Sequence, residues 1–510
     1  MVAAAAWLTA GTAWLAQAPS ASARATPRAP SMASGGGSRT AAAVAEWLTT
    51  GDQSSLLAPQ TVLHLGAAAS PGAQTIAVDD ATRYQTLTGF GAALTDSAAW
   101  LLSRLPADTR TSTLNRLFAA GAGSSGGVGA SGGGGAGGRG GPGPLTVVRV
   151  PLGSSDFVVG RHYSYDDLPS DAAPGATDPT LSRFSIARDE AYLIPLLRDI
   201  RALNPAVRIV ASPWSAPAWM KTSGSLVGGT LDGAWSDAYA RYLVLTLKAF
   251  AADGVPVDGL TVQNEPEFSP GDYPGMTLTE PQEAELIAHH LGPALVASGL
   301  NVALLGYDHN WEDPTFPASL LANRPSAKYL AGVAFHCNAG DVSAQTKIHN
   351  AAPQAAIWLS ECSGGSWSAG FAADLVWETR NLFVGGTRNW ATAVLWFNLA
   401  LDPGGGPHNG GCTQCRGMLT VDPATGSVTD NVEYWSLAHA ALGAHPGGVR
   451  VASSTFGNGN LETTAFRNLD GSHALVVVNS GTTPRTLQIQ TRTRSTPATL
   501  PGGAVATFIW

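Results

Sequence analysis

The sequence predicts an α/β protein: a (β/α)8 TIM barrel with an attached β-sandwich side domain at its C-terminal end. Short apolar runs recur along the chain with helical segments between them, a pattern typical of β–α units around a parallel sheet. Eight such runs can be counted, and eight parallel strands close a barrel of this type. After about residue 432 the pattern changes to alternating apolar and polar residues, which indicates antiparallel strands.

The eight predicted barrel strands also share a feature at their ends. They begin near Thr86, Thr146, Arg208, Leu260, Val302, Gly332, Ala356 and Ala393. Nearly all of them lead into polar or aromatic side chains, namely Asp96, Ser154, Asp156, Trp214, Glu265, His309, His336, Glu361 and Asn398. Because barrel active sites are assembled at the carboxyl ends of the strands, we expect this set to surround a site.

The remaining segments divide the chain further. The N-terminal stretch is apolar and ends in small residues, as in a signal peptide, although an ordinary hydrophobic helix is the alternative. A Gly/Ser/Ala-rich stretch with linker composition follows. The predicted division is a signal peptide at 1–25, a linker at 26–44, N-terminal strands of the side domain at 45–85, the barrel at 86–435 with a Gly-rich insert at 121–145, and the β-sandwich at 436–510.

Composition excludes some partners and favours others. The formal net charge is −8 and the chain contains no basic run, so an electrostatic nucleic-acid partner is not expected. No segment has 18 uninterrupted apolar residues, so we expect no membrane span. The 15 tryptophans suit a neutral, hydroxyl-rich ligand such as a sugar. Together with the signal peptide, this predicts a secreted, extracellular protein.

The four cysteines are Cys337, Cys362, Cys412 and Cys415. An even number in an exported protein favours disulfides, and the sequence leaves their pairing open. A zinc site is the alternative interpretation, because two of the cysteines form a C-x-x-C pair, but the other two lack close spacing.

Glu265 and Glu361 are the strongest candidates for catalysis. Glu265 ends the fourth run within VQNEP, and Glu361 ends the seventh within WLSEC, so the two side chains can face each other across the barrel mouth. Retaining glycoside hydrolysis needs two carboxyl groups ~5–5.5 Å apart, one to protonate the leaving group and one to attack the sugar. We therefore predict Glu265 as acid/base and Glu361 as nucleophile. The alternatives are a solvated turn residue for Glu265 and a salt bridge for Glu361.

The neighbours of Glu265 support this interpretation. Pro266 is expected to hold Glu265 in extended geometry, and Asn264 is placed to hydrogen-bond a sugar 2-hydroxyl group. We expect a raised pKa for Glu265 while Glu361 is ionised. His336 is either a site residue or a satisfied core histidine.

Several tryptophans are candidates for stacking on a sugar ring, although tryptophan is also a common core residue. The candidates are Trp214, Trp219, Trp311 and Trp396. Trp214 is preferred because Pro213 and Pro217 stiffen its loop.

At these residues the chain resembles glycoside hydrolase family 30, the family of glucosylceramidases and related β-glucosidases, β-xylosidases and β-1,6-glucanases. The similarity runs from roughly Trp47 to Trp510. It is carried, in order, by GFGAALTDSAAW, VRVPLGSSDF, ASPWSAPAWMKTSGSLVGG, TVQNEPE, AFHCNAGD, WLSECSGG, FNLALDPGGGPHNGG and ATFIW.

The resemblance implies the same two catalytic roles, Glu265 as acid/base and Glu361 as nucleophile. It also implies that Asp96, Trp214 and Asn264 line the subsite of the non-reducing sugar and that Asn409 joins them. His336 and Trp396 complete the residues that we expect to bind substrate.

Two positions depart from the family's common pattern near this subsite. Many relatives carry a tyrosine that can hydrogen-bond the nucleophile where this chain has Asn338. Many also carry a tryptophan before NLAL where this chain has Phe397. These changes bear on substrate preference and leave the reaction class unchanged.

The predicted function is therefore a retaining, glucosylceramidase-like β-glycoside hydrolase that acts through a covalent glycosyl-enzyme, without metal or organic cofactor. Its expected partner is a β-linked glycan or glycolipid. The segment from Gly410 to Asp422 resembles bacterial and fungal branches of the family more than the animal lysosomal enzymes. An endo-β-1,6-glucanase or β-xylosidase acting on extracellular glycans is thus the alternative.

Two other classes of function compete with hydrolysis by paired carboxylates. The first is a catalytically silent carbohydrate-binding protein, but binding alone has no need for two facing carboxylates. The second is a metal-dependent barrel hydrolase, which is disfavoured because the strand ends lack an H-x-H motif or a clustered His/Asp set in the sequence.

Overall fold

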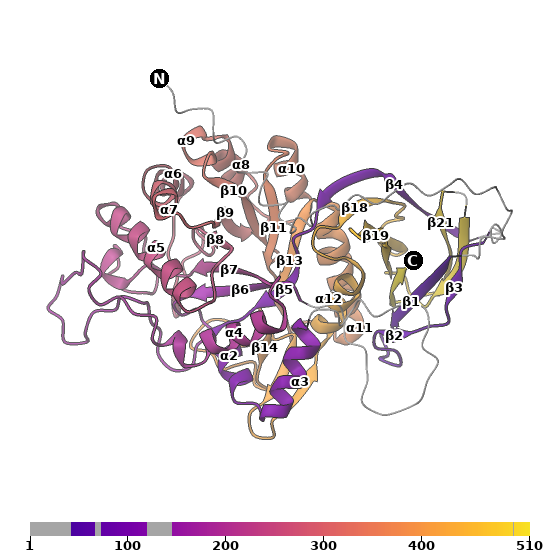
Figure 1. Cartoon of the computed structure of the whole chain (residues 1–510), viewed down its shortest axis with the longest axis horizontal. Coiled ribbons are helices and arrows are strands. Elements are labelled where there is room, and N and C mark those ends of the chain that lie inside the picture. The colour runs from indigo at the N-terminus through magenta and orange to yellow at the C-terminus, as the bar shows by residue number, and fades with distance from the viewer. Residues whose placement is uncertain (1–41, 67–72, 120–144, 493) are drawn as a thin grey trace, which may run out of the picture.

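The computed structural model describes residues 42–66, 73–119, 145–492 and 494–510. The predicted signal peptide, the linker up to residue 41 and the Gly-rich insert up to residue 144 lie outside the described residues. Figure 1 shows a helix-wrapped barrel on one side and a β-rich domain on the other, with α12 (Val432–Gly443) and α11 (Phe371–Glu378) between them. Within these described ranges, no helix is both long and apolar enough to cross a bilayer.

Eight parallel strands close the barrel, which confirms the predicted fold class. Each of the eight predicted apolar runs supplies one strand, and the last pairs with the first. In chain order they are β5 (Gly89–Ala93), β6 (Val147–Leu152), β7 (Arg208–Pro213), β8 (Gly259–Thr261), β9 (Ala303–Asn310), β10 (Leu330–His336), β11 (Ala356–Glu361) and β13 (Ala391–Trp396).

Helices connect the strands and cover the barrel. In α4, for example, Leu193, Leu197 and Ile200 recur at helical spacing and are buried against the sheet. The covering helices are α2 (Asp96–Ser103), α3 (Ala107–Phe118), α4 (Leu193–Leu203), α5 (Ser236–Ala252), α6 (Glu280–Glu285), α7 (Gly292–Ser298), α8 (Thr315–Ala322), α9 (Arg324–Ala327), α10 (Ser343–Ala351), α11 and α12.

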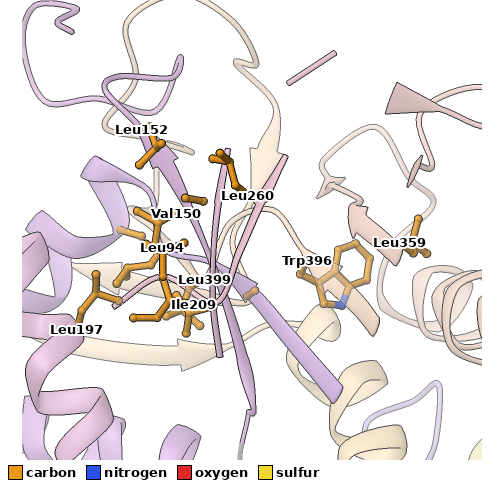
Figure 2. Close-up of a cluster of buried hydrophobic side chains, with 14 of the residues drawn as sticks. Leu94, Val150, Leu152, Leu197, Ile209, Leu260, Leu359, Trp396 and Leu399 are labelled. Atoms are coloured by element: carbon orange, nitrogen blue, oxygen red, sulfur yellow. The ribbon is translucent and has the colours of Figure 1, made fainter. Parts of the chain in front are cut away.

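The barrel strands are buried on both faces, so their side chains divide between two cores. One core fills the barrel interior and includes Val210, Leu305 and Trp358. The other lies between the barrel and its helices and includes Ile209, Leu359 and Trp396 (Figure 2). Neighbouring residues on one strand therefore enter different cores, as the two-residue period of a strand requires.

The side domain is built around one large sheet that joins both ends of the described chain. Strand β1 (Ala43–Thr49) pairs with β23 (Val505–Ile509), and β4 (Gln74–Thr86) pairs with β18 (Val449–Ser453) and β21 (Arg485–Thr491). The other strands of this sheet are β2 (Ala58–Pro59), β3 (Leu63–His64), β19 (Leu461–Arg467), β20 (His473–Asn479) and β22 (Arg494–Leu500).

The C-terminal strands begin later in the chain than the sequence predicts. The expected start of the side domain at residue 436 falls inside α12, and the first C-terminal strand begins at Val449. The cause is burial, since every residue of α12 is buried between the barrel and the large sheet, which removes the amphipathic pattern that marks a surface helix. His439 of α12 bonds Thr49 on β1 at 2.8 Å and Thr507 on β23 at 3.0 Å.

Glu283 on α6 is a fully buried carboxyl group that contacts β9. Its Oε1 accepts a hydrogen bond from the Tyr307 amide at 2.8 Å, and its Oε2 finds no hydrogen-bond partner among the described residues. Burial raises the pKa of Glu283 to about 8. A buried group of this kind makes stability depend on pH.

We expect the stability of Glu283→Gln relative to wild type to be greater at neutral pH than at acid pH. The folded carboxyl stays protonated up to about pH 8, whereas the unfolded one ionises near pH 4.5, so wild-type stability falls as the pH rises between these values. The amide does not ionise, so the stability of the variant relative to wild type should rise over this window by on the order of 2 kcal/mol. Urea unfolding at pH 4 and pH 8 checks this, and a difference that does not change with pH would contradict it.

Candidate active site

Arg149 lies at the centre of the barrel mouth and is completely buried on β6. Its Nη1 donates to Glu361 Oε2 at 2.6 Å, and its Nη2 donates to Asp308 Oδ2 and to Asn264 Oδ1, each at 2.8 Å. One guanidinium group thus connects β6 with the ends of β9 and β11 and with the segment that follows β8. Such a buried charge is tolerable because two carboxylates pair with it.

His336, at the end of β10, forms a second connection between the acidic side chains. Its Nε2 lies 3.0 Å from Asp308 Oδ1 and its Nδ1 lies 3.1 Å from Glu265 Oε1. The same Nδ1 is 3.8 Å from Glu361 Oε1. The two predicted catalytic carboxylates therefore both lie close to one imidazole nitrogen, and the sequence-predicted residues Glu265, Glu361, Asn264 and His336 come together.

The charges in this cluster determine where its proton lies. Burial opposes protonation of His336, but the charges on Glu361 and Asp308 raise its pKa to about 10. Burial would raise the pKa of Asp308, yet Arg149 and His336 hold it well below its usual range. At neutral pH the imidazole is therefore charged, and Asp308 is an ionised residue that positions both His336 and Arg149.

The pKa of Glu265 differs from the sequence expectation. Burial alone would raise it, but the neighbouring His309 and His336 imidazoles hold it below its usual range. Burial raises the pKa of Glu361, against the charges of His336 and Arg149. The expected raised pKa of Glu265 is thus wrong for the substrate-free site, because a protonated imidazole 3.1 Å away carries the proton instead.

The backbone of Glu265 also differs from the expectation of extended geometry. Its φ is +48°, in the left-handed region, which costs on the order of 1–3 kcal/mol for a non-glycine residue. A following proline disfavours the right-handed helical region and leaves this one open. The Glu265 amide donates to the Asp308 carbonyl at 3.0 Å, and the Glu265 carbonyl accepts from Phe268 at 2.9 Å. These contacts hold the strained turn against β9.

A disulfide fixes the ends of β10 and β11. Cys337 follows His336 and is bonded to Cys362, which follows Glu361, with a Cα–Cα distance of 5.2 Å. Cys412 and Cys415 form the second disulfide, so all four cysteines are paired and do not form a zinc site. The first disulfide ties His336 and Glu361 into one covalently closed unit.

Trp214 and Phe397 form the aromatic wall of the mouth. Their rings are stacked at 5.7 Å with an interplanar angle of 19°, and the Arg149 guanidinium lies 4.8 Å from the Trp214 ring. Phe397, the residue that departs from the family's common pattern, therefore packs directly on Trp214.

The expectation that Trp396 binds substrate is wrong. Its side chain is only 2% exposed and packs in the layer between the barrel and the helices (Figure 2). Because consecutive strand residues point to opposite faces, Trp396 points away from the mouth and Phe397 points toward it.

Asp96, the first residue of α2, and Asn409, in a loop, are both already engaged by other groups. The Asp96 carboxylate accepts hydrogen bonds from the Val159 amide at 2.7 Å and the Tyr192 hydroxyl at 2.6 Å. The Asn409 side chain donates to the Gly160 carbonyl at 3.0 Å. Both side chains therefore brace the loop that follows β6, and a role in sugar binding remains an expectation for each.

A cavity of about 460 Å³ opens beside Glu265. Its lining is mostly polar and acidic, with two aromatic side chains, and comprises Glu265, Glu267, Phe268, Tyr273, His309, Asn310, Glu312, Asp313 and Asn338. The backbone amide of Asn338 donates to Asn310 Oδ1 at 3.0 Å. Asn338, which stands where many relatives have a tyrosine, therefore lies in the wall of this cavity.

Sequence reasoning missed Arg149 and Asp308, which hold the site together. Arg149 interrupts the otherwise apolar strand sequence VVRVPL, and a charge inside a buried strand requires partners. That signal was available in the sequence, but it could not name the partners, which lie 159 and 212 residues away. Within the described ranges, Glu265, His309 and His336 also bring three possible metal-ligand atoms within 4.8 Å of one another, a cluster the sequence did not reveal.

A barrel with two carboxylates at its mouth, a buried arginine on one of them and an aromatic wall has the features of a glycoside hydrolase. Residues 140–441 match the model of the glycosyl hydrolase family 30 TIM-barrel domain, and residues 447–508 match that family's beta sandwich domain. The chain belongs to glycosyl hydrolase family 30 and is an O-glycosyl hydrolase.

Named relatives fall into two groups. The chain is 32% identical to an endo-1,6-beta-D-glucanase of Neurospora crassa, over 79% of this chain and 81% of the relative. It is 29% identical to the lysosomal acid glucosylceramidase of Mus musculus, over 84% of this chain and 82% of that protein. Among solved structures, the endo-beta1,6-glucanase BT3312 superposes with a TM-score of 0.81 at 26% identity, covering 92% of this chain and 99% of that one.

Proposed function

We propose that the protein is a retaining β-glycosidase that hydrolyses β-1,6-linked glucan, with Glu361 as nucleophile and Glu265 as acid/base. The observation that carries the mechanism is that Glu265 Oε1 and Glu361 Oε1 lie 3.1 Å and 3.8 Å from the same nitrogen of His336. These contacts place the two Oε1 atoms no more than about 7 Å apart, below most of the ~6.5–9.5 Å range in which an inverting enzyme holds a water between its carboxyl groups. This geometry favours retention.

The surroundings of the two carboxylates support their different roles. Glu361 is held by Arg149 at 2.6 Å, which fixes its orientation and stabilises its ionised form for attack on the anomeric carbon. Glu265 has the more exposed side chain, 14% against 8%, and borders the open cavity where a leaving group has room. Glu265 is therefore the better proton donor to a departing sugar oxygen.

The reaction proceeds in two balanced steps. In the first, a Glu361 oxygen bonds to the anomeric carbon, the glycosidic C–O bond breaks, and Glu265 delivers a proton to the leaving oxygen. In the second, Glu265 removes a proton from water, the water oxygen attacks the anomeric carbon, and the bond to Glu361 breaks. His336 Nδ1 lies within hydrogen-bond distance of Glu265, so it passes a proton to Glu265 before the first step and takes one back after the second, while Glu265 stays ionised between the two steps.

The choice of a glucan over a glycolipid rests on the cavity beside Glu265 and on the relatives. A ceramide would need an apolar surface for its chains, whereas this cavity presents carboxylates, amides and only two aromatic rings, which suit a second sugar. The named endo-1,6-beta-D-glucanases are 30–32% identical to this chain and the named glucosylceramidases 27–29%. Glucosylceramide is therefore the second candidate.

A substrate panel tests this proposal. We expect release of reducing sugar from a linear β-1,6-glucan to exceed turnover of glucosylceramide, aryl β-glucoside and aryl β-xyloside in kcat/KM. Glu265→Ala and Glu361→Ala variants run in parallel should lose the same activity. A preference for glucosylceramide would overturn the substrate assignment, and no turnover by folded protein would favour a binding protein.

We also propose that the protein is exported and acts outside the cell. Disulfides form and persist in oxidising compartments, and this chain has two, one of them at the active site. The predicted signal peptide is consistent with that route. Recovery of the mature protein from the culture medium of a producing cell, with its N-terminus near residue 26, tests the proposal.

A further inference from the structure

The geometry points to a second ligand for this site: we propose that Glu265, His309 and His336 bind a divalent transition-metal ion such as Zn²⁺, and that the bound ion blocks hydrolysis. The ion would be an inhibitor, since retaining hydrolysis by two carboxylates needs no metal. The inhibition rests on the proposed function, whereas the binding site rests only on the three side chains.

The spacing of the three donors fits one small ion. Glu265 Oε1 lies 3.1 Å from His336 Nδ1 and 3.7 Å from His309 Nδ1. All three donor atoms lie within 4.8 Å of one another. Ligands of a tetrahedral zinc ion, with bonds of about 2.0–2.1 Å, are about 3.3 Å apart, so only small side-chain shifts would bring the donors to bonding distance.

His309 is the residue that points most directly to a ligand. Its side chain is 6% exposed, yet its Nδ1 makes no hydrogen bond within the described ranges, and it lies 3.7 Å from Glu265 Oε1. A buried nitrogen without a partner is costly, and a metal ion between it and Glu265 would satisfy both groups. Nothing in the proposed hydrolytic mechanism uses this nitrogen.

His336 is already oriented as a metal ligand. Its Nε2 is bound to Asp308 at 3.0 Å, so the ring is fixed with Nδ1 facing Glu265. A carboxylate behind a histidine is the usual arrangement around protein-bound zinc, where it sets the ring orientation and strengthens the ligand. Ligation would displace the proton from Nδ1.

The donor set determines which ions fit. Two imidazole nitrogens and one carboxylate match Zn²⁺ or Cu²⁺, whereas Mg²⁺ and Ca²⁺ prefer an all-oxygen set. The cavity beside Glu265 and His309 leaves the remaining coordination position open to water. A metal held there would occupy the Glu265 oxygen that must exchange a proton with substrate, so both steps of hydrolysis would stop.

The test combines direct binding with inhibition. Zn²⁺ is titrated calorimetrically into metal-free wild type, His309→Gln and His289→Gln, and the rate of glycoside hydrolysis is measured over the same Zn²⁺ range. His289 is the matched control, because its side chain is 59% exposed on the barrel exterior and pairs with Glu285 at 3.6 Å. Each variant is compared with its own rate in the presence of a chelator.

Wild type and His289→Gln should each bind one Zn²⁺ ion with micromolar affinity and lose most of their activity, which the chelator restores. His309→Gln should bind at least tenfold more weakly and need at least tenfold more Zn²⁺ for half inhibition. Equal binding by His309→Gln and wild type, or no binding at 1 mM, would overturn the site. Binding that depends on His309 in a protein that hydrolyses no glycoside would support the site and overturn only the proposed function.

Discussion

Replacing Glu361 with alanine is expected to lower kcat on an aryl β-glucoside by about 10⁵-fold or more, the scale seen when a covalent nucleophile is removed. The loss follows because Asp308, the other carboxylate that Arg149 bonds, is fully buried and engaged by His336, so it cannot take the place of Glu361 in the attack. Removing the Glu361 side chain also leaves the buried Arg149 with one carboxylate of its pair, that of Asp308. Thermal unfolding therefore checks that the variant is folded. Steady-state kinetics with chelator present measures the effect.

Glu265→Ala should behave differently from Glu361→Ala, because it removes the acid/base and keeps the nucleophile. General acid catalysis contributes about 10²–10⁴-fold, and it matters most for poor leaving groups. The variant should therefore retain more activity on a dinitrophenyl glucoside than on a glucan, and added azide should rescue turnover as a β-glucosyl azide. A similar loss on both substrates, without rescue, would contradict the assignment of Glu265.

Arg149→Met is expected to destabilise the protein by about 3–5 kcal/mol and to abolish measurable activity, the second largest effect. Methionine keeps much of the volume but leaves His336, among the described residues, as the one cation for Asp308, Glu361 and Glu265, and buried charges that lose a partner are strongly unfavourable. Urea unfolding measures the change in the free energy of unfolding.

Arg198→Met is the matched control, because Arg198 pairs with Asp253 at 2.8 Å while its own side chain is 50% exposed. Exposed pairs are worth about 0–1 kcal/mol, so this variant should unfold almost like wild type. Combining Arg149→Met with Glu361→Gln should recover part of the lost stability, because it removes one of the charges that lost a partner. Equal effects of the two arginine variants would contradict a central role for Arg149.

The sequence predicted the barrel because its strands are short apolar runs bounded by helices, and each of the eight runs became one strand. It misplaced the start of the C-terminal strands because α12 is buried on all sides and therefore lacks an amphipathic pattern. The pairing of β1 with β23 could not be derived in register, since it joins residues more than 450 positions apart through tertiary packing.

The candidate site shows the same contrast between what local sequence patterns predict and what depends on contacts with distant residues. Glu265 and Glu361 were found because each ends an apolar run in the sequence, which is a local signal. Trp396 was assigned to the wrong face because a shift of one residue reverses the direction of a strand side chain. The low pKa of Glu265 could not be predicted either, because it depends on His309 and His336, which come from other strands.

Trapping of the covalent intermediate tests the central claim most directly. A 2-deoxy-2-fluoro-β-glucosyl fluoride carries a leaving group that departs readily, while its 2-fluorine slows the second step, so the glycosyl-enzyme should accumulate. Mass spectrometry of the digested protein should then find one added fluoroglucosyl group on the peptide that contains Glu361. A label on another residue, or inactivated protein without any label, would contradict Glu361 as the nucleophile of a retaining enzyme.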